Sequence, residues 1–549
     1  MVYFSTFFVS LFITLVLIPI LTKLALRKHI VDEPGPRKVH TLPMPKLGGL
    51  AIATGTLFPI IIWTDFVAEI KGLVSGLVII VVLGLLDDFY ELRYREKFIG
   101  QFVATFVAIF LSRIYVTQLG SLGELNLILP LWIALPLTVV FIVGATNAIN
   151  LADGLDGLAA GISLLSFGCI AYLAYISGEM PIFISSLAII GAILGFLRFN
   201  TYPATIFMGD TGSQFLGFSA GWLSLALTQK ETNPLSHVLP VIILGFPILD
   251  TLAVMLERFS QGRPIFIADK NHFHHKLLRI GFSHKEAVII IYFLQCLLIT
   301  FALIFRYYPE GFLFGGYLLF CLIVLCFFYI AERTHWVLRR SVNMDKDLAF
   351  ATLSSSTKDK INKGVFKIIS FIIPILLLFL SLIPRQIPKD MGIISLLLLT
   401  IILVVYTTKR EVWLRFFIRL NLYIAGIFLI YLVNKEKIIW FQINMYYLQI
   451  IIFSLLMVLI AICVKFSEPE YFQMTPLDYL IIFMIFIILL ISHLPRKQIA
   501  MDNLSIFLAE TMVFFWGVEL ILSHKFGKWN ALSVSTLIVL FITGIRGLF

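Results

Sequence analysis

Long apolar runs recur from one end of this 549-residue chain to the other. Individual runs are about 15 to 24 residues long, and a helix of about 20 apolar residues crosses the hydrocarbon core of a bilayer. Hydrophobic residues make up 60% of the chain and charged residues 13%, roughly half the charged share of an ordinary soluble domain. A water-soluble globule of this composition could not cover its own core. The sequence therefore predicts an all-α, polytopic integral membrane protein.

About eleven spans are expected in an N-terminal core and about seven in a C-terminal extension. Residues 3–26 are expected to be a true first span rather than a cleavable signal, because the run is long and no basic segment precedes it. The core spans are expected at 3–26, 47–63, 73–86, 98–115, 128–145, 158–175, 181–197, 215–227, 238–256, 287–305 and 312–331. The later spans are expected at 366–382, 393–406, 414–433, 447–464, 479–491, 504–522 and 532–542.

Basic residues are distributed unevenly between the loops of the core. Loops expected on one side hold fifteen Lys and Arg, whereas those on the other side hold only Lys71, Lys230 and Arg306. The positive-inside rule then places the first set of loops in the cytoplasm and the N-terminus outside, in a bacterial inner membrane. The same rule and anionic lipid account for the net charge of +10, so no nucleic-acid partner is expected.

The chain is expected to have three parts. Residues 1–331 form the membrane-embedded core, residues 332–365 form a polar, basic cytoplasmic linker, and residues 366–549 form an additional transmembrane domain whose role the sequence leaves open. Within that last domain, Glu510 and Glu519 share one expected span. Ionisable residues inside a membrane are typical of transporters, which would give this domain a transport function. The two acids could equally be inert or paired within the protein, so both interpretations are open.

Five polar clusters interrupt the apolar pattern of the core, and all five fall on the basic, cytoplasmic side. A transporter has no reason to gather acids, amides, glycines and histidines at one face, whereas an enzyme acting on a cytoplasmic substrate does. The clusters are residues 32–49 (DEPGPRKVHTLPMPKLGG), 87–97 (DDFYELRYREK), 147–157 (NAINLADGLDG), 198–213 (RFNTYPATIFMGDTGS) and 263–275 (RPIFIADKNHFHH).

The acids of these clusters suit a magnesium site with a phosphate substrate. Carboxylates at a membrane boundary are costly unless they meet a cation, and Mg²⁺ takes one or two carboxylates and bridges substrate phosphates. Cationic side chains and His residues on the first and fifth loops could hold a diphosphate. Each cluster alone also fits a helix cap, a turn or a lipid-facing basic patch. Asp250, eight residues before Arg258, is equally open to a structural ion pair or a catalytic role.

Five segments carry a resemblance to a known family. The sequence resembles the polyprenyl-phosphate N-acetylhexosamine-1-phosphate transferases of glycosyltransferase family 4, a superfamily that includes the phospho-MurNAc-pentapeptide translocase. The match covers residues 1 to about 330. It rests on RKVHTLPMPKLGGLAI, GLLDDFYEL, NAINLADGLDGLAAG, NTYPATIFMGDTGSQFLG and ADKNHFHHKLLRIGFS.

The resemblance implies transfer of a sugar-1-phosphate from a UDP-N-acetylhexosamine to undecaprenyl phosphate, with release of UMP and a requirement for Mg²⁺, for which Mn²⁺ can substitute. It implies Asp210 as the metal ligand and one member of the aspartate pair, left open here, as the base that deprotonates the lipid phosphate. The catalytic residues expected are Asp87, Asp88, Asp156, His274 and His275. The substrate-binding residues expected are Arg37, His40, Asn147, Asn150, Asp153, Asn200 and His272.

The form of the motifs bears on the sugar. HFHH after Asp-Lys-Asn, together with RKVH and PMPKLGG, is similar to the GlcNAc-1-phosphate branch, which feeds O-antigen, teichoic acid or a similar envelope glycan. The alternatives are a phospho-MurNAc-pentapeptide transferase, a carrier of lipid-linked sugars formed by the C-terminal part, and a non-catalytic scaffold. The last is disfavoured because Asp87, Asp88, Asp153, Asp156 and Asp210 are all present. A homodimer or other envelope-glycan enzymes remain open as partners.

Overall fold

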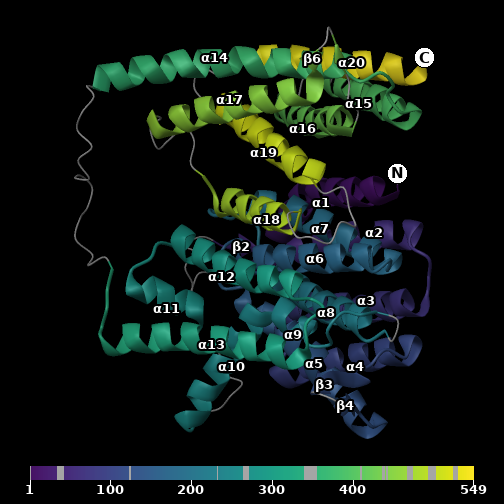
Figure 1. Ribbon diagram of the computed structural model, residues 1–549, viewed down its shortest axis with the longest axis vertical. Helices are drawn as coiled ribbons and strands as arrows, with labels where there is room; N and C mark the ends of the chain where they lie inside the picture. Colours follow the sequence, from purple (N-terminus) through teal and green to yellow (C-terminus); the bar gives the residue numbers. More distant parts are fainter. Residues whose placement is uncertain are drawn as a thin grey trace. The chain divides into compact units, whose positions relative to one another are not determined.

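A computed structural model describes residues 2–33, 43–122, 125–230, 233–263, 271–338, 355–407, 411–435, 439–440, 443–466, 474–492, 502–523 and 529–549. Every expected span forms helix, and strands are confined to three short antiparallel pairs within these residues (Figure 1). Twelve of the described helices are long and apolar enough to cross a membrane. The prediction of an all-α, multi-pass membrane protein is confirmed.

The described residues pack as two compact units. The first comprises Met1–Asn343 and Thr475–Ile487, and the second comprises Met344–Met474 and Ile488–Phe549. The helices of the first are α1 (Val2–Arg27), α2 (Gly48–Trp63), α3 (Ala68–Tyr90), α4 (Tyr94–Ser112), α5 (Leu131–Ala152), α6 (Leu158–Ile176), α7 (Met180–Asn200), α8 (Gly209–Thr228), α9 (Leu239–Ile243), α10 (Gly245–Ser260), α11 (Phe273–Ile280), α12 (His284–Ile304), α13 (Glu310–Arg333) and most of α18 (Pro476–Ser492). Its strands are β1 (Val31–Asp32) paired with β2 (Met44–Pro45), and β3 (Gln118–Leu122) paired with β4 (Leu125–Ile128).

The second unit is built from six helices and one strand pair among its described residues. The helices are α14 (Ser355–Leu382), α15 (Lys389–Thr407), α16 (Glu411–Lys435), α17 (Met445–Phe466), α19 (Asp502–Ser523) and α20 (Trp529–Leu548). The strands are β5 (Ile439–Trp440) and β6 (Ile443–Asn444). Two boundaries differ from the sequence-based division. Helix α14 begins at Ser355, inside the segment expected to be a linker. Most of α18 packs with the first unit, although α18 is one of the spans expected in the C-terminal domain.

Helix α8 forms the centre of the first unit. Each of its residues from Thr211 to Thr228 is buried, and it packs against α2, α3, α5 and α6. Small residues allow this close approach: a Cβ on Gly217 would lie 2.6 Å from Thr146 Cα of α5, and one on Gly84 of α3 would lie 2.4 Å from Thr211 Cα. The N-terminus of α8 is therefore held tightly by three neighbouring helices.

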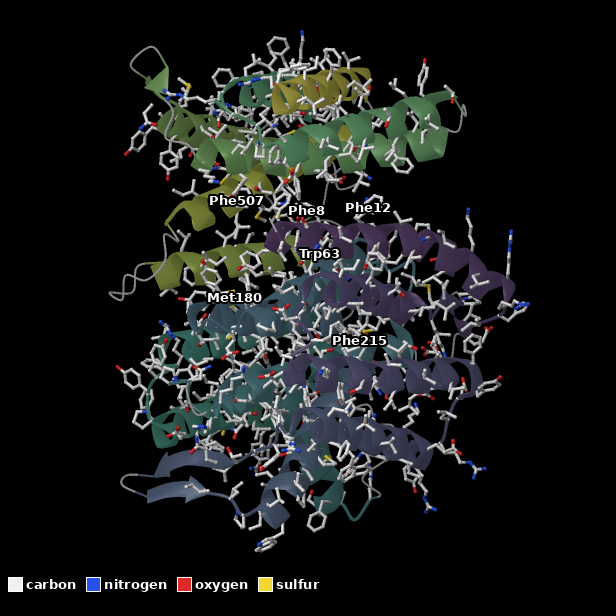
Figure 2. The ribbon with its side chains drawn as sticks, turned by 90° about the vertical axis from the view of Figure 1, so that its right-hand side faces the viewer. Phe8, Phe12, Trp63, Met180, Phe215 and Phe507 are labelled. Atoms are coloured by element: carbon white, nitrogen blue, oxygen red, sulfur yellow. The ribbon has the colours of Figure 1, made fainter. Side chains whose placement is uncertain are left out.

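Apolar side chains lie on the outside of the first unit as well as inside it. Phe215 of α8 is fully buried, whereas Phe12 of α1 is 37% exposed (Figure 2). Phe110 of α4 is 82% exposed. Helices that are apolar all round are stable in lipid, where the outer face needs no polar cover. The exposed aromatic rings therefore mark a surface that is solvated by the bilayer.

The expected span at 238–256 is broken into α9 and α10 at Leu244. Pro247 explains the break, because a proline inside a helix removes a donor and clashes with the carbonyl four residues earlier, here that of Ile243. The freed Ile243 carbonyl accepts hydrogen bonds from Gln295 Nε2 of α12 at 2.7 Å and from Ser166 Oγ of α6 at 2.9 Å. Gln295 also accepts from the Phe246 amide at 3.3 Å. One fully buried glutamine thus replaces the missing helical bonds.

Replacing Gln295 with Leu should lower the stability of the protein by about 1–3 kcal/mol, because the Phe246 amide would lose its partner and the Ile243 carbonyl would lose one of two. Thermal unfolding in detergent, followed by intrinsic fluorescence, measures this difference. The conservative Gln295→Glu variant keeps an acceptor for Phe246 and serves as the comparison. Equal unfolding temperatures for Gln295→Leu and the parent would contradict a stabilising role for this side chain.

Candidate active site

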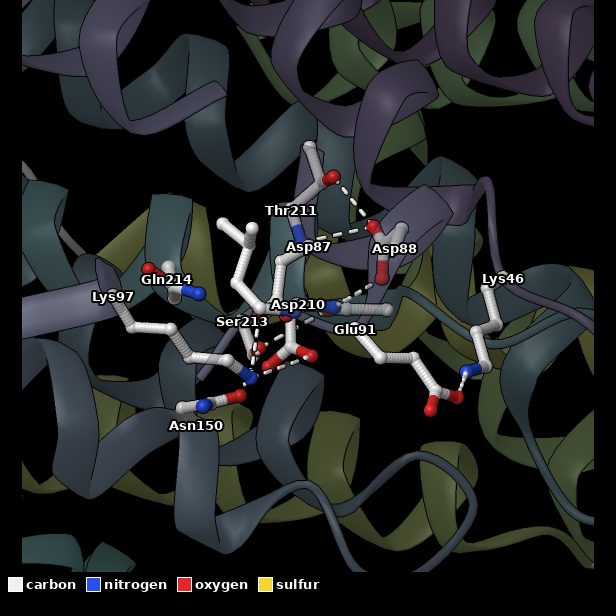
Figure 3. A network of polar contacts seen from close by, with 12 residues as sticks. Lys46, Asp87, Asp88, Glu91, Lys97, Asn150, Asp210, Thr211, Ser213 and Gln214 are labelled. Atoms are coloured by element: carbon white, nitrogen blue, oxygen red, sulfur yellow. Dashed lines mark hydrogen bonds and ion pairs between the residues drawn. The ribbon is translucent and has the colours of Figure 1, made fainter. Parts of the chain in front are cut away.

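Three helices bring two aspartates and a lysine together at one end of the first unit. Lys97 Nζ of α4 lies 2.5 Å from Asp87 Oδ2 of α3 and 3.4 Å from Asp210 Oδ2 of α8 (Figure 3). The Asp87 side chain is 1% exposed, whereas that of Asp210 is 31% exposed. Asp210 is therefore the accessible carboxylate of this trio. The sequence placed Lys97 in a polar cluster but gave no reason to pair it with residues of α3 and α8.

Asp88 holds the N-terminus of α8. Its Oδ1 accepts from the Asp210 amide at 2.8 Å, and its Oδ2 accepts from the Thr211 amide at 3.1 Å and from Thr211 Oγ1 at 2.5 Å (Figure 3). Amides at a helix N-terminus lack partners within the helix, and a carboxylate there also complements the helix dipole. Both oxygens of Asp88 are committed to this cap. Asp88 thus caps the turn of α8 that carries Asp210, and the catalytic role expected for it stays a prediction.

Amide side chains line the same end of the bundle. Asn147 of α5 donates to Gln101 of α4 at 2.7 Å, and Gln101 donates to Gln214 of α8 at 3.1 Å. One turn later on α5, Asn150 accepts from Ser213 Oγ of α8 at 2.6 Å. Gln101 and Gln214 were not predicted as site residues. The sequence feature that could have identified them is that each glutamine lies inside an apolar helix. A polar group buried there is costly unless it is hydrogen-bonded.

The loop between α5 and α6 is bound to the segment that leads into α8. Asp156 Oδ2 accepts from the Ala204 amide at 2.9 Å, and Asn200 accepts from the Gly157 amide at 3.0 Å and donates to the Ile206 carbonyl at 2.9 Å. These contacts use both ends of the buried Asn200 amide. Asn200, expected to bind substrate, and Asp156, expected to be catalytic, therefore fasten two loops of the site to each other.

The histidine segment forms a helix instead of the expected loop. Asp250 of α10 accepts from the Phe273 amide at 2.7 Å, and its other oxygen lies 2.8 Å from His272 Nδ1. Asp250 thus anchors the first turn of α11, and the sequence did not foresee this link to the histidines. His272 is buried in this pair, and the substrate contact expected for it stays a prediction.

His274 lies directly over the acidic loop. A Cβ on Gly154 would be 2.3 Å from His274 Nε2, so only a glycine fits beneath the ring. His274 is 3% exposed and its Nε2 has no hydrogen-bond partner among the described residues. His275 is adjacent, with ring centroids 4.2 Å apart. Burial, with repulsion from His275 and His272, holds the pKa of His274 well below its usual value, so the ring is neutral at pH 7.

The first cluster joins the others through its backbone. The Gly48 and Gly49 amides donate to the Phe207 and Met208 carbonyls at 3.0 and 2.8 Å, just before α8 begins. Lys46 Nζ lies 3.2 Å from Asp32 Oδ1. Arg37 and His40, expected to bind substrate, lie outside the described residues. The described parts of all five clusters therefore meet at one end of the first unit, as the sequence predicted from their shared side.

The carboxylates here gather more negative charge than Lys97 can balance. Burial raises the pKa of Asp153 to about 7, and repulsion from Asp210, Asp156, Asp88 and Asp32 adds to the effect. Among the described residues no three His, Cys, Asp or Glu side chains converge closely enough to hold a metal ion alone. That is compatible with Mg²⁺, which keeps several waters and binds through one or two carboxylates plus substrate phosphates. The carboxylates of this site therefore fit a Mg²⁺ ion whose remaining ligands are water and a substrate phosphate.

The raised pKa of Asp153 gives a testable pH dependence. The folded protein keeps this proton to a higher pH than the unfolded chain does, so the stability it contributes is lost as pH rises from about 4 to about 7. In chelator, Asp153→Asn is expected to unfold at a higher temperature than the parent at pH 8, and the advantage is expected to shrink at pH 5. Parallel pH profiles for parent and variant, measured by scanning fluorimetry, would contradict this assignment.

Comparison with known proteins agrees with this geometry. The model of glycosyl transferase family 4 matches residues 70–228, a segment that contains Asp87, Lys97, Asp153 and Asp210. The chain is 43% identical over 296 residues to the probable undecaprenyl-phosphate N-acetylglucosaminyl 1-phosphate transferase of Bacillus subtilis (strain 168), an alignment that covers 52% of this chain and 80% of that relative. The chain belongs to glycosyl transferase family 4.

Two further members of the family are more distant. The undecaprenyl-phosphate alpha-N-acetylglucosaminyl 1-phosphate transferase of Escherichia coli O157:H7 is 30% identical over 352 residues, which is 62% of this chain and 94% of that relative. The enzyme of the same description from Yersinia pestis is 29% identical over 326 residues, 58% of this chain and 88% of that relative. These alignments leave more than a third of the present chain unmatched, so this family 4 protein carries a large additional part.

Proposed function

We propose that this family 4 protein transfers N-acetylglucosamine-1-phosphate from its UDP-activated form to undecaprenyl phosphate and releases UMP, as the first membrane step of a cell-envelope glycan. The observation that carries the proposal is the convergence of five distant polar segments around Asp210, beside a buried His274 with an unpaired ring nitrogen. The names of the relatives support the acceptor and the sugar.

The chemistry exchanges one phosphoanhydride bond for another. An oxygen of the acceptor phosphate attacks the β-phosphorus of the donor, the bond from that phosphorus to the bridging oxygen breaks, and UMP leaves with that oxygen. In phosphoryl transfer the protein mainly positions the reactants and neutralises charge. Mg²⁺ held by Asp210 would neutralise the diphosphate when bound. Mn²⁺ is a second candidate ion for the same ligand.

The protein groups divide this work by their geometry. Lys97 holds Asp210 in place and partly balances its charge, while Asp88 fixes the turn of α8 that carries Asp210. Asp87, buried against Lys97, holds this lysine beside Asp210, and proton exchange with the acceptor phosphate is left to the aspartate pair without a choice of member. The neutral His274, whose Nε2 has no partner among the described residues, is the group proposed to hydrogen-bond a diphosphate oxygen.

An apolar groove beside this site supports a lipid acceptor. It has a volume of about 420 Å³ and lies between α4 and α5, lined by residues that include Phe102, Phe106, Trp132 and Val140. Phe102 follows Lys97 by five residues on α4, about 7.5 Å along the helix axis. A phosphate at Lys97 would thus leave its prenyl tail beside the groove, within the bilayer. The uneven distribution of basic residues between the core loops supports an active site at the cytoplasmic face and an N-terminus outside.

A donor panel tests the proposed specificity. Purified protein with Mg²⁺ and undecaprenyl phosphate is offered UDP-GlcNAc, UDP-GalNAc and UDP-MurNAc-pentapeptide in separate reactions, and the lipid products are identified by mass. We expect a product from UDP-GlcNAc. A product from UDP-MurNAc-pentapeptide alone would reassign the protein to the pentapeptide branch, and no product from any donor would refute the reaction.

A further inference from the structure

The second unit contains a buried carboxylate that lies apart from the proposed active site. Glu510 of α19 is 4% exposed, and its Oε2 accepts from Asn434 Nδ2 of α16 at 2.6 Å and from Gln449 Nε2 of α17 at 2.5 Å. Asn434 and Gln449 are likewise 4% and 3% exposed. Three helices thus bring one acid and two amides together in the interior of this bundle.

The hydrogen bonding of this cluster is unbalanced. Both amide nitrogens donate to the same carboxylate oxygen, and three oxygens remain buried without a donor among the described residues: Glu510 Oε1, Asn434 Oδ1 and Gln449 Oε1. A buried acceptor without a donor is costly, and more so when it carries charge. Each amide oxygen is bonded to the same carbon as a nitrogen that contacts the carboxylate, so the unsatisfied acceptors belong to the same three-residue cluster.

We propose that Glu510, Asn434 and Gln449 form a binding site for an alkali-metal cation. All three unsatisfied atoms are hard oxygen acceptors and one belongs to a carboxylate, so a cation would satisfy them and balance the charge of Glu510. A proton on Glu510 Oε1 could be donated to only one of the two amide oxygens, so the other amide oxygen would still lack a partner. A metal ion, in contrast, can coordinate several oxygens at once. The cluster has a single carboxylate, so its formal charge of −1 matches a monovalent ion.

The other acid of α19 provides the contrast. Glu519 accepts a hydrogen bond from Arg419 Nη2 at 2.5 Å and another from the Tyr423 hydroxyl, so its charge is already paired within the protein. Glu510 and Glu519 were equivalent in the sequence, as two acids in one span. The structure separates them into a paired residue and one that needs a cation. Ionisable groups inside membrane bundles commonly mark ion pathways.

Sodium binding to the full-length protein tests the site directly. Protein purified in detergent is incubated with ²²Na⁺ in choline chloride at fixed ionic strength, and bound label is measured with unlabelled NaCl as competitor. We expect saturable binding by the parent and by Glu519→Gln. Glu510→Gln should weaken binding at least tenfold, and Gln449→Leu, which removes one oxygen ligand, should weaken it by a smaller factor. Size-exclusion chromatography confirms that each variant is folded.

Two results would overturn the proposal. No saturable binding above protein-free micelles would show that no alkali ion occupies the site, including the case in which Glu510 simply holds a proton. Equal binding by the parent, Glu510→Gln and Gln449→Leu would place the ion elsewhere. Competition by KCl and LiCl in the same assay then ranks the ions that the site accepts.

Discussion

Asp210→Asn is expected to lower transferase turnover by about three orders of magnitude at saturating Mg²⁺, while the protein remains folded. The exposed carboxylate of Asp210 is the proposed metal ligand, and removing one group that stabilises developing charge costs about 10²- to 10³-fold in rate. The substitution keeps the side chain's shape, so the cap that Asp88 makes on the α8 amides should persist. UMP release with UDP-GlcNAc and undecaprenyl phosphate measures the effect.

Glu91→Gln is the matched control for this experiment. Glu91 follows α3 closely after the aspartate pair, but its side chain is 87% exposed and its nearest cation, Lys46, is 4.0 Å away. An exposed pair of this kind contributes little, so turnover should stay near the parent's. Near-parental UMP release by Asp210→Asn would remove Asp210 from the metal site.

Lys97→Met should reduce turnover by about two orders of magnitude. Without the ammonium group, the buried Asp87 carboxylate would lose its cation and Asp210 would no longer be held in place. Breaking a buried pair by removing one partner costs more than the pair contributes, because an uncompensated charge remains. Steady-state UMP release measures the change, and Lys97→Arg, which restores a cation in a different shape, is expected to recover part of the activity.

Arg95→Met provides the comparison on the same turn of α4. Arg95 is exposed and contacts only the neighbouring Tyr94 ring and hydroxyl among the described residues. Its loss should leave turnover nearly unchanged. If Lys97→Met were as active as Arg95→Met, Lys97 would be one more basic residue of a cytoplasmic loop. Its contacts with Asp87 and Asp210 would then not be needed for turnover.

The helices and the shared side of the polar clusters were predictable because hydropathy and charge bias act locally along the chain. Partners across the fold were not, because a single sequence contains no signal for contacts between distant residues. Lys97 and Asp210 are 113 residues apart, and Asp250 and His272 are 22 apart on separate helices. The break at Leu244 was not expected, although Gly245 and Pro247 could have indicated it, and the glutamine that satisfies the freed backbone groups lies on α12.

Roles were harder to predict than positions. Asp88, Asp156 and Asn200 were expected to act on substrate, and those roles stay predictions. The structure adds what the residue types could not show, that their polar atoms hydrogen-bond the backbone of α8 and of the adjoining loops. The two acids of α19 illustrate the same limit, since sequence alone could not tell the paired Glu519 from Glu510.

The most direct test of the proposed reaction follows the β-phosphate of the donor. Purified protein is given UDP-GlcNAc labelled with ³²P at that phosphate, together with Mg²⁺ and undecaprenyl phosphate, and the organic and aqueous phases are counted separately. Transfer of a sugar-1-phosphate predicts label in the lipid phase, in amounts equal to the unlabelled UMP formed. Label that stays in the aqueous phase as UDP while sugar enters the lipid would show glycosyl transfer instead and would contradict the account.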